Sequence, residues 1–403
     1  MKKPLISIIL ISYKNYRYIY EALDSILCQD YLNIEIIISN DGSDDFDQKS
    51  VNQYLTKNKK QNIKNFIINN NKKNIGTVKN VNKAIKLSKG KYITIFAADD
   101  TLYNSQVVTK FINSFNTLPK NELIVTSQVD MYDVRLKKII QPFISETNKE
   151  KIRKLTPKKL FAEMSTQCIL PGSGTCYKRE IFKKYGYFDE KYVLVEDYSS
   201  ALRLSRLGVK YNYFDFISIK HRDGGISHGN IIGDTSAISK YDLDIFNIFK
   251  FEVLPYLNLL NERQKKEFIK KYKDIEWKYS YNYKYKNGTK IQRRKFVIEN
   301  FNIISYSFFK NIFNDISDQV KGKKFMLFLI GLILLTIYSF NVDFGSSFFS
   351  IFSIEKNPDW SNSINKTIGF LGLFIVTLSI TMTIFLFSKK YAIQIYKFIK
   401  FIF

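Results

Sequence analysis

Three polar clusters in the first hundred residues each follow an apolar run. They are Ser12-Tyr13-Lys14-Asn15 after residues 5–11, Asn40-Asp41-Gly42-Ser43 after residues 34–38, and Asp99-Asp100 after residues 92–96. Carboxylates beside a buried strand are costly unless a cation or hydrogen-bond donors meet them. Their hard oxygen atoms suit Mg²⁺ or Mn²⁺ held together with substrate phosphates. The clusters therefore predict a site for a divalent cation and a phosphorylated ligand.

A further acidic pair, Glu196-Asp197, opens a segment in which leucines recur at helical spacing. Acids are common at a helix N-terminus because the helix dipole favours them. A carboxylate at that place could instead accept the proton of an attacking hydroxyl, which is the task of a general base. Residues 171–174, Pro-Gly-Ser-Gly, are typical of a loop that edges a site, since small residues permit close approach.

The elements that must position these residues alternate between strand and helix patterns. Strands are predicted at 5–11, 34–38, 65–68 and 92–96, and helices over 19–27 and 78–87. This alternation favours βαβ units, and hence an α/β fold with a mostly parallel sheet and flanking helices. Ligands of such sheets bind beyond the carboxyl ends of the strands, where the polar clusters lie.

Composition divides the chain into three predicted regions. Residues 1–228 carry the strand and helix alternation, residues 229–322 are helical, basic and aromatic, and residues 323–403 are dominated by apolar stretches. In the middle region, 246–260 and 263–284 have helical patterns with interleaved lysines and aromatics. That region is interpreted either as a clamp on an anionic membrane surface or as a solvated helical linker.

The last region predicts a membrane hairpin, with transmembrane helices at about 324–342 and 366–387. Both stretches lack charged side chains in their apolar cores, and lysines flank the outer ends of the pair. By the positive-inside rule, both outer ends and residues 1–228 then face the cytoplasm from the cytoplasmic membrane. The alternative is a buried hairpin of core helices.

The net charge of +25 favours polyanionic partners such as nucleic acid, anionic lipid or phosphorylated substrates. The cations are spread along the chain and no nucleic-acid recognition motif appears, so we expect no nucleic-acid partner. The three cysteines, Cys28, Cys168 and Cys176, have no disulfide or metal-type spacing, which predicts free thiols.

Taken in order, the motifs closely resemble those of family 2 glycosyltransferases, which have the GT-A fold of nucleotide-diphospho-sugar transferases. The matching stretches cover roughly the first 225 residues. They are S-Y-K and N-D-G-S within residues 5–43, N-I-G-T-V-K-N and F-A-A-D-D within 74–100, and G-S-G-T-C-Y-K, G-Y-F-D-E and V-E-D-Y within 172–208. The resemblance implies a bacterial, membrane-anchored enzyme that inverts the anomeric centre.

The resemblance also implies a role for each matching residue. Asp197 matches the catalytic base, with Glu196 beside it at the acceptor hydroxyl. The implied donor nucleotide-binding residues are Ser12, Tyr13, Asp41, Lys79 and Asp99; the acceptor-side residues are Gly172, Ser173 and Glu196; and the residues near the cation are Asp99, Asp100 and His221. The implied partners are a nucleotide-sugar, with a UDP-sugar expected, and a glycan or lipid-linked acceptor.

The chain departs from the family pattern at three positions. Ala97 replaces the first aspartate of the D-x-D motif, so Asp99 must serve the cation with only Asp100 beside it. Lys14 replaces the usual asparagine, and Asn40 the first acid of the D-D-G-S type. The loss at Ala97 keeps open a catalytically silent partner of a glycan-synthesis complex. A processive synthase is not expected, because the chain lacks a Q-x-x-R-W motif and further membrane stretches.

Overall fold

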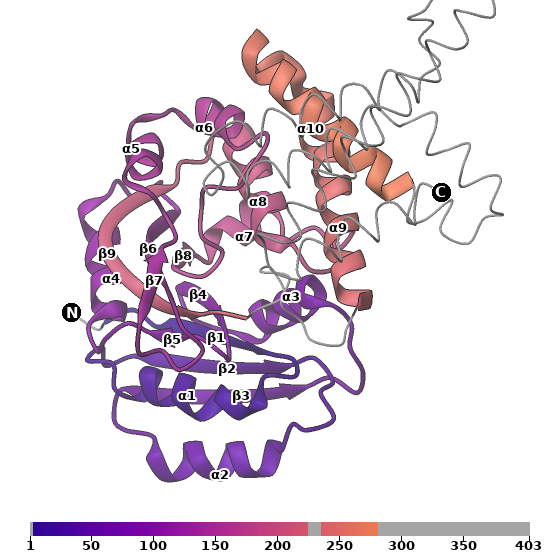
Figure 1. Ribbon diagram of the computed structural model, residues 1–403. Helices are drawn as coiled ribbons and strands as arrows, with labels where there is room; N and C mark the ends of the chain where they lie inside the picture. The colour runs from indigo at the N-terminus through magenta and orange to yellow at the C-terminus, as the bar shows by residue number, and fades with distance from the viewer. Residues whose placement is uncertain (1–2, 225–234, 281–403) are drawn as a thin grey trace, which may run out of the picture. The chain divides into compact units, whose positions relative to one another are not determined.

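The computed structural model describes residues 3–224 and 235–280, and Figure 1 shows how their elements are arranged. The chain divides into two compact units, residues 1–279 and residues 280–403. The domain boundary expected at residue 228 falls inside the first of these units and stays a prediction. The predicted transmembrane helices lie outside the described residues. Among the residues described, no helix is both long and apolar enough to cross a bilayer.

The described strands form one mixed sheet. Its strands are β1 (Ile6–Ser12), β2 (Ile34–Asn40), β3 (Ile63–Asn70), β4 (Tyr92–Ala97), β5 (Thr101–Leu102), β6 (Ile124–Tyr132), β7 (Ile139–Pro142), β8 (Thr175–Lys178) and β9 (Asn212–Arg222). Their order is β3-β2-β1-β4-β8-β6-β9-β5, with β7 on β6. The β3-β2-β1-β4 half is parallel, whereas β8 is antiparallel to both neighbours. The expected α/β sheet is thus confirmed, but it is parallel mainly in its N-terminal half.

Helices flank both faces of this sheet. They are α1 (Ile19–Leu27), α2 (Gln48–Asn58), α3 (Thr77–Leu87), α4 (Val107–Thr117), α5 (Glu146–Lys154), α6 (Pro157–Glu163), α7 (Glu180–Tyr185), α8 (Glu196–Arg206), α9 (Thr235–Ile248) and α10 (Glu262–Ser280). Side chains alternate along β1, so Ile8 and Leu10 join the core under α1 and α4, while Ile9 joins the core under α3 and α8. Two hydrophobic cores therefore fix the sheet from opposite sides.

Strand register brings the polar clusters together, as expected. In the parallel half, Ser12 lies opposite Asn40, Asn40 lies opposite Asn70, and Ile11 lies opposite Ala97. The carboxyl ends of β1, β2 and β4 consequently meet at one edge of the sheet. In the other half, β9 curves past β6 and reaches β5 (Figure 1), which brings Arg222 and His221 beside the β4–β5 turn.

The segment after residue 234 packs onto the domain. Phe249 and Phe268 are fully buried in the core that also holds Leu202 of α8. Helix α9 passes into a π-helix (η3, Phe249–Val253) and a 3₁₀ helix (η4, Leu254–Leu259), where Pro255 interrupts α-helical bonding. For its described part, this region is neither a solvated linker nor a single helix over 246–260.

Candidate active site

The end of β1 is tied to Asp99 through Asn15. The Oδ1 atom of Asn15 accepts bonds from Ser12 Oγ at 2.9 Å and from the Tyr13 amide at 3.1 Å. Its Nδ2 atom donates to Asp99 Oδ1 at 3.2 Å. Lys14 between them has a φ of 55°, in the left-handed region that asparagine tolerates better than lysine. Asn15 is thus a site residue that the motif assignment missed, although it stood in the quoted cluster.

Asp41 holds the loop between β3 and α3. Its carboxylate accepts hydrogen bonds from the amides of Ile75 and Gly76, both at 2.9 Å, and from Asn71 Nδ2 at 3.1 Å. The side chain is only 2% exposed. Gly42 follows with a φ of 72°, and an added Cβ would lie 2.4 Å from the backbone of Lys73. This packing explains the Asp-Gly pair structurally, while the nucleobase contact of Asp41 stays a prediction.

Asp99 and Asp100 have different surroundings. Burial, and then the nearby Asp100 charge, raise the pKa of Asp99 to about 6. Asp100 is 1% exposed and accepts hydrogen bonds at 2.9 Å from the Arg222 amide on Oδ1, while its Oδ2 lies 2.9 Å from His221 Nδ1. Asp100 therefore orients His221. Of these two acids, Asp99 is the one whose carboxylate is not engaged by both His221 and the Arg222 amide.

His221 is charged near neutral pH in this arrangement. Burial by itself lowers its pKa, but the charge of Asp100 and the hydrogen bond to it outweigh that effect and raise the pKa to about 9. Arg222 next to it is 2% exposed, donates to the Asp99 carbonyl at 2.7 Å and pairs with Glu21 at 2.8 Å. Arg222 stood in the quoted Lys-His-Arg stretch, yet its role depends on Glu21, which lies 201 residues away.

The residues around Asp99 fit a divalent cation. Mg²⁺ usually takes one or two protein carboxylates together with substrate phosphates, and Asp99 supplies one whose raised pKa a cation would lower again. No cluster of three or more metal-ligating side chains occurs among the residues that the structure describes. The roles of Asp100 and His221 as residues near the cation stay predictions. In the structure these two side chains contact each other.

The acid pair opens α8, as expected. Asp197 accepts a hydrogen bond at 2.7 Å from the amide of Tyr198, and a Cβ added to Gly172 would lie 2.4 Å from Asp197 Oδ2. Burial, and then the Asp197 charge, raise the pKa of Glu196, and burial raises the pKa of Asp197. Gly172 therefore lies directly against the predicted base, whereas the acceptor-side role of Ser173 stays a prediction.

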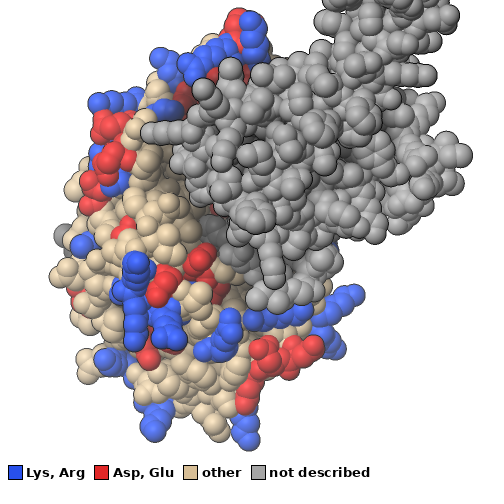
Figure 2. Space-filling view, in the orientation of Figure 1, with Lys and Arg blue, Asp and Glu red and all other residues tan. Residues whose placement is uncertain are grey.

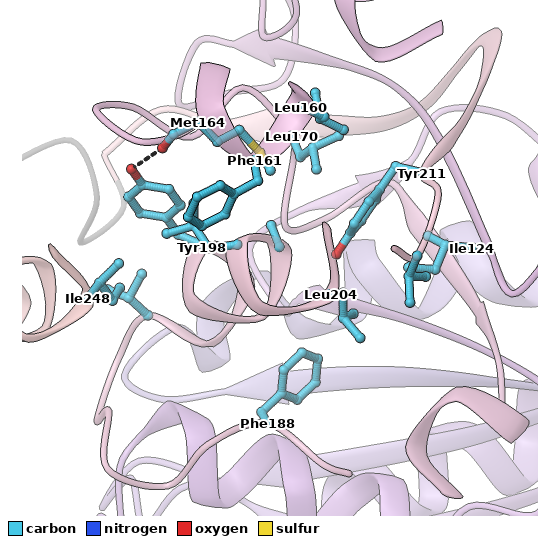
Figure 3. Close-up of a cluster of buried hydrophobic side chains, with 14 of the residues drawn as sticks. Ile124, Leu160, Phe161, Met164, Leu170, Phe188, Tyr198, Leu204, Tyr211 and Ile248 are labelled. Atoms are coloured by element: carbon cyan, nitrogen blue, oxygen red, sulfur yellow. Dashed lines mark hydrogen bonds between the residues drawn. The ribbon is translucent and has the colours of Figure 1, made fainter. Parts of the chain in front are cut away.

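Helix α8 is held firmly behind these acids. Tyr198 and Leu204 point into the core, and the Tyr198 hydroxyl donates to the carbonyl oxygen of Met164 at 2.6 Å (Figure 3). Such anchoring limits the movement of the first helical turn, which carries both acids. Lys79, in contrast, is exposed on the first turn of α3, and Tyr13 is partly exposed at the sheet edge.

Asp244 of α9 clamps the loop that leads into α8. Its carboxylate accepts hydrogen bonds from three consecutive amides: Val193 at 2.8 Å, Leu194 at 2.6 Å and Val195 at 3.1 Å. Asp244 is 1% exposed. Sequence reasoning missed this residue, because it lies beyond the matching motifs. It is also about fifty residues from the loop along the chain, and no local pattern predicts such a contact.

Hydrogen bonds thus link Ser12, Asn15 and Asp99 at the sheet edge. A separate set of hydrogen bonds holds the acid pair and the loop before it at the start of α8. Residues 7–186 match the family model described as Glycosyl transferase family 2. This segment is therefore similar to glycosyl transferase family 2 domains. Helix α8, which carries the acid pair, and strand β9 lie beyond the matched segment.

Several proteins of similar sequence are named glycosyltransferases. Uncharacterized glycosyltransferases of Rickettsia typhi and Rickettsia prowazekii are each 32% identical, over 220 and 222 residues, or 54% of this chain. The chain spans 64% of the length of these two curated relatives. An uncharacterized glycosyltransferase of Haemophilus influenzae is 28% identical over 242 residues, 59% of this chain and 69% of the relative. Each of these relatives is named a glycosyltransferase, which is the enzyme class expected from the sequence motifs.

Among solved structures, TarS of S. aureus in complex with UDP-GlcNAc is similar with a TM-score of 0.47 and 16% identity, over 74% of this chain and 80% of that chain.

Proposed function

We propose that this protein transfers a sugar from a nucleoside-diphosphate sugar, with UDP as the expected nucleotide, to a hydroxyl of a glycan or lipid-linked acceptor. The observation that carries the proposal is the acid pair Glu196 and Asp197, held beneath Gly172 and beyond the segment that matches family 2. The Asp197 carboxylate accepts a hydrogen bond from the Tyr198 amide and forms no ion pair among the described residues, so it is suited to accept a proton.

The proposed reaction is a single displacement with inversion. The acceptor hydroxyl attacks the anomeric carbon, its proton passes to Asp197, and the bond from that carbon to the diphosphate oxygen breaks. Negative charge then builds on the leaving nucleoside diphosphate, which a divalent cation at Asp99 would neutralise. Asn15 and Arg222 keep Asp99 in place through its side chain and its carbonyl oxygen.

The wider setting is part of the same proposal: bacterial surface polysaccharide synthesis, with a C-terminal membrane hairpin and the domain facing the cytoplasm. On the face seen in Figure 2, basic and acidic side chains are interspersed. A test of the anchor compares the full chain with residues 1–280 in membrane fractions. Recovery of both in the soluble fraction would contradict the anchor and leave the enzyme proposal standing.

The activity is tested by nucleotide release from the full chain in detergent. UDP-, GDP- and TDP-sugars are supplied with Mg²⁺ or Mn²⁺, and Asp197→Asn is assayed in parallel. We expect one donor to be turned over and Asp197→Asn to lose about a hundredfold to ten thousandfold of the rate, the usual range for a general base. If no donor is bound or turned over, the silent-partner alternative, which Ala97 favours, replaces the enzyme.

A further inference from the structure

A cavity of about 440 Å³ is lined by other residues than those of the candidate active site. It is formed where β6 and the bulged part of β9 meet α4 and α5. Its lining consists of Tyr103, Lys110, Gln128, Asp130, Pro142, Lys149, Asp215, Phe216 and Ile217. This lining includes none of the predicted donor, cation or base residues, and cavities of this size accept small molecules.

Two polar side chains in the lining are more than nine-tenths buried. Gln128 is 3% exposed and Asp130 is 6% exposed, and they contact each other through a long bond of 3.3 Å from Gln128 Nε2 to Asp130 Oδ1. The Oε1 atom of Gln128 has no hydrogen-bond partner within the described structure. A buried acceptor without a donor is uncommon in folded proteins and costs stability. That Gln128 oxygen is shielded from solvent, so the acceptor that the lining can offer to a ligand with hydrogen-bond donors is the Asp130 carboxylate, which accepts only the long bond from Gln128 among the described residues.

The charges in the lining nearly cancel. Lys149 contacts Glu146 at 2.7 Å and Asp215 at 3.4 Å, and Asp215 also pairs with Arg153 at 3.2 Å. Lys110 lies with its ammonium nitrogen 5.8 Å from the ring centre of Phe216. An anionic ligand would meet the carboxylates of Asp130 and Asp215, and a cationic one would meet the two lysines. A neutral ligand with both donors and acceptors fits this lining.

The rest of the lining is apolar and partly aromatic, with Tyr103, Phe216, Ile217 and Pro142. Aromatic rings beside a few fixed polar groups are typical of sites that bind a ligand with one apolar face and one polar edge. A pyranose ring has both: C–H groups on its faces and adjacent hydroxyls, each a donor and an acceptor, around its rim.

We propose that this cavity binds a neutral sugar unit outside the catalytic groups. The inference rests on the proposed function, since a glycan acceptor would supply such a unit. Strands β6 and β9 line the cavity and continue to the sheet edge. In their register Asp130 lies opposite Lys220, the residue before His221. A sugar bound there would hold an acceptor on the strands that lead to the donor end of the sheet.

The test measures sugar binding to the full chain in detergent by saturation-transfer NMR. The probes are the methyl glycosides of glucose, galactose, mannose and N-acetylglucosamine, each with excess UDP present to fill the nucleotide site. We expect at least one probe to bind with a millimolar dissociation constant, about −4 kcal/mol. Gln128→Leu should weaken it about tenfold or more. Gln61→Leu, the same change at an exposed position, should leave it unchanged.

Each outcome decides the question. Binding by no probe in the presence of UDP, or equal binding by Gln128→Leu, would overturn the proposal. Thermal melting checks the variant, which should fold with a lower melting temperature because leucine removes the donor to the buried Asp130 carboxylate. If Gln128→Leu does not fold, Lys110→Ala at the rim replaces it. Nucleotide release is a separate readout, so sugar binding without turnover would contradict only the proposed function.

Discussion

Gly172 controls the space above the predicted base. We expect Gly172→Ala to lower kcat by about a hundredfold, because a Cβ 2.4 Å from Asp197 Oδ2 must push the carboxylate aside, and small misplacements of catalytic groups cost that much. Steady-state kinetics with the turned-over donor checks this, with nucleotide affinity and melting temperature as controls. An unchanged kcat would show that Asp197 does not act from its present position.

Glu196 should make stability depend on pH. Burial and the Asp197 charge raise its pKa from 4.5 to about 8, so the folded protein holds a proton that the unfolded chain has lost between these values. Unfolding then releases a proton, and stability falls as pH rises from about 4.5 to 8. Glu196→Gln removes this dependence. Its stability relative to the parent should therefore increase with pH.

Urea unfolding at pH 5, 7 and 9 measures this effect. Glu180→Gln is the matched control, since Glu180 also lies in the first turn of a helix but is exposed. A constant difference between Glu196→Gln and the parent across this range would contradict the raised pKa.

For single residues, the sequence predicted which residues lie at the sheet edge better than it predicted which side chains contact each other. Ser12 and Asp41 could be placed at the sheet edge because strand ends in a parallel sheet coincide. The His221 and Asp100 contact joins residues 121 apart, and no local pattern encodes such a pairing. Asn15 was visible as a polar neighbour, but its bond to Asp99 requires the left-handed turn at Lys14.

Among the elements, α9 has a defined effect on α8 through Asp244. We expect Asp244→Asn to lower kcat about a hundredfold with little change in nucleotide affinity, because the loop before Glu196 loses its carboxylate acceptor. Hydrogen exchange at residues 193–195 should become faster in the variant. Asp242→Asn, an exposed change on the same helix, is the control.

Two results would contradict this positioning role for Asp244. One is fast exchange of the 193–195 amides in the parent protein. The other is a variant that exchanges faster at these amides but retains full kcat.

The predictable elements are those with strong local periodicity. The strands expected at 34–38 and 92–96 were found as Ile34–Asn40 and Tyr92–Ala97, because continuous apolar runs identify buried parallel strands. The antiparallel half was not predicted. There β8 has only four residues, Thr175–Lys178, and its direction is set by contacts with β4 and β6 rather than by its own pattern.

For the whole molecule, the folding unit is longer than the motif region. We expect residues 1–280 to unfold cooperatively and residues 1–228 to aggregate or melt broadly. The shorter chain leaves uncovered the core that Phe249 and Phe268 fill, and each such side chain contributes about 1.5–3 kcal/mol when buried. Thermal melting and gel filtration of both chains check this. Cooperative melting of 1–228 would restore the boundary expected from composition.

The clamp on the loop before α8 also bears on how the protein is made. The amides of Val193, Leu194 and Val195 receive their acceptor from Asp244, a residue synthesised about fifty positions later. Domains tend to fold as units while the ribosome still extends the chain. The sheet and the sites at its edge can therefore assemble first, whereas the acid pair becomes fixed only when α9 has emerged. A nascent chain that stops short of α9 would carry the family motifs and still lack an ordered base.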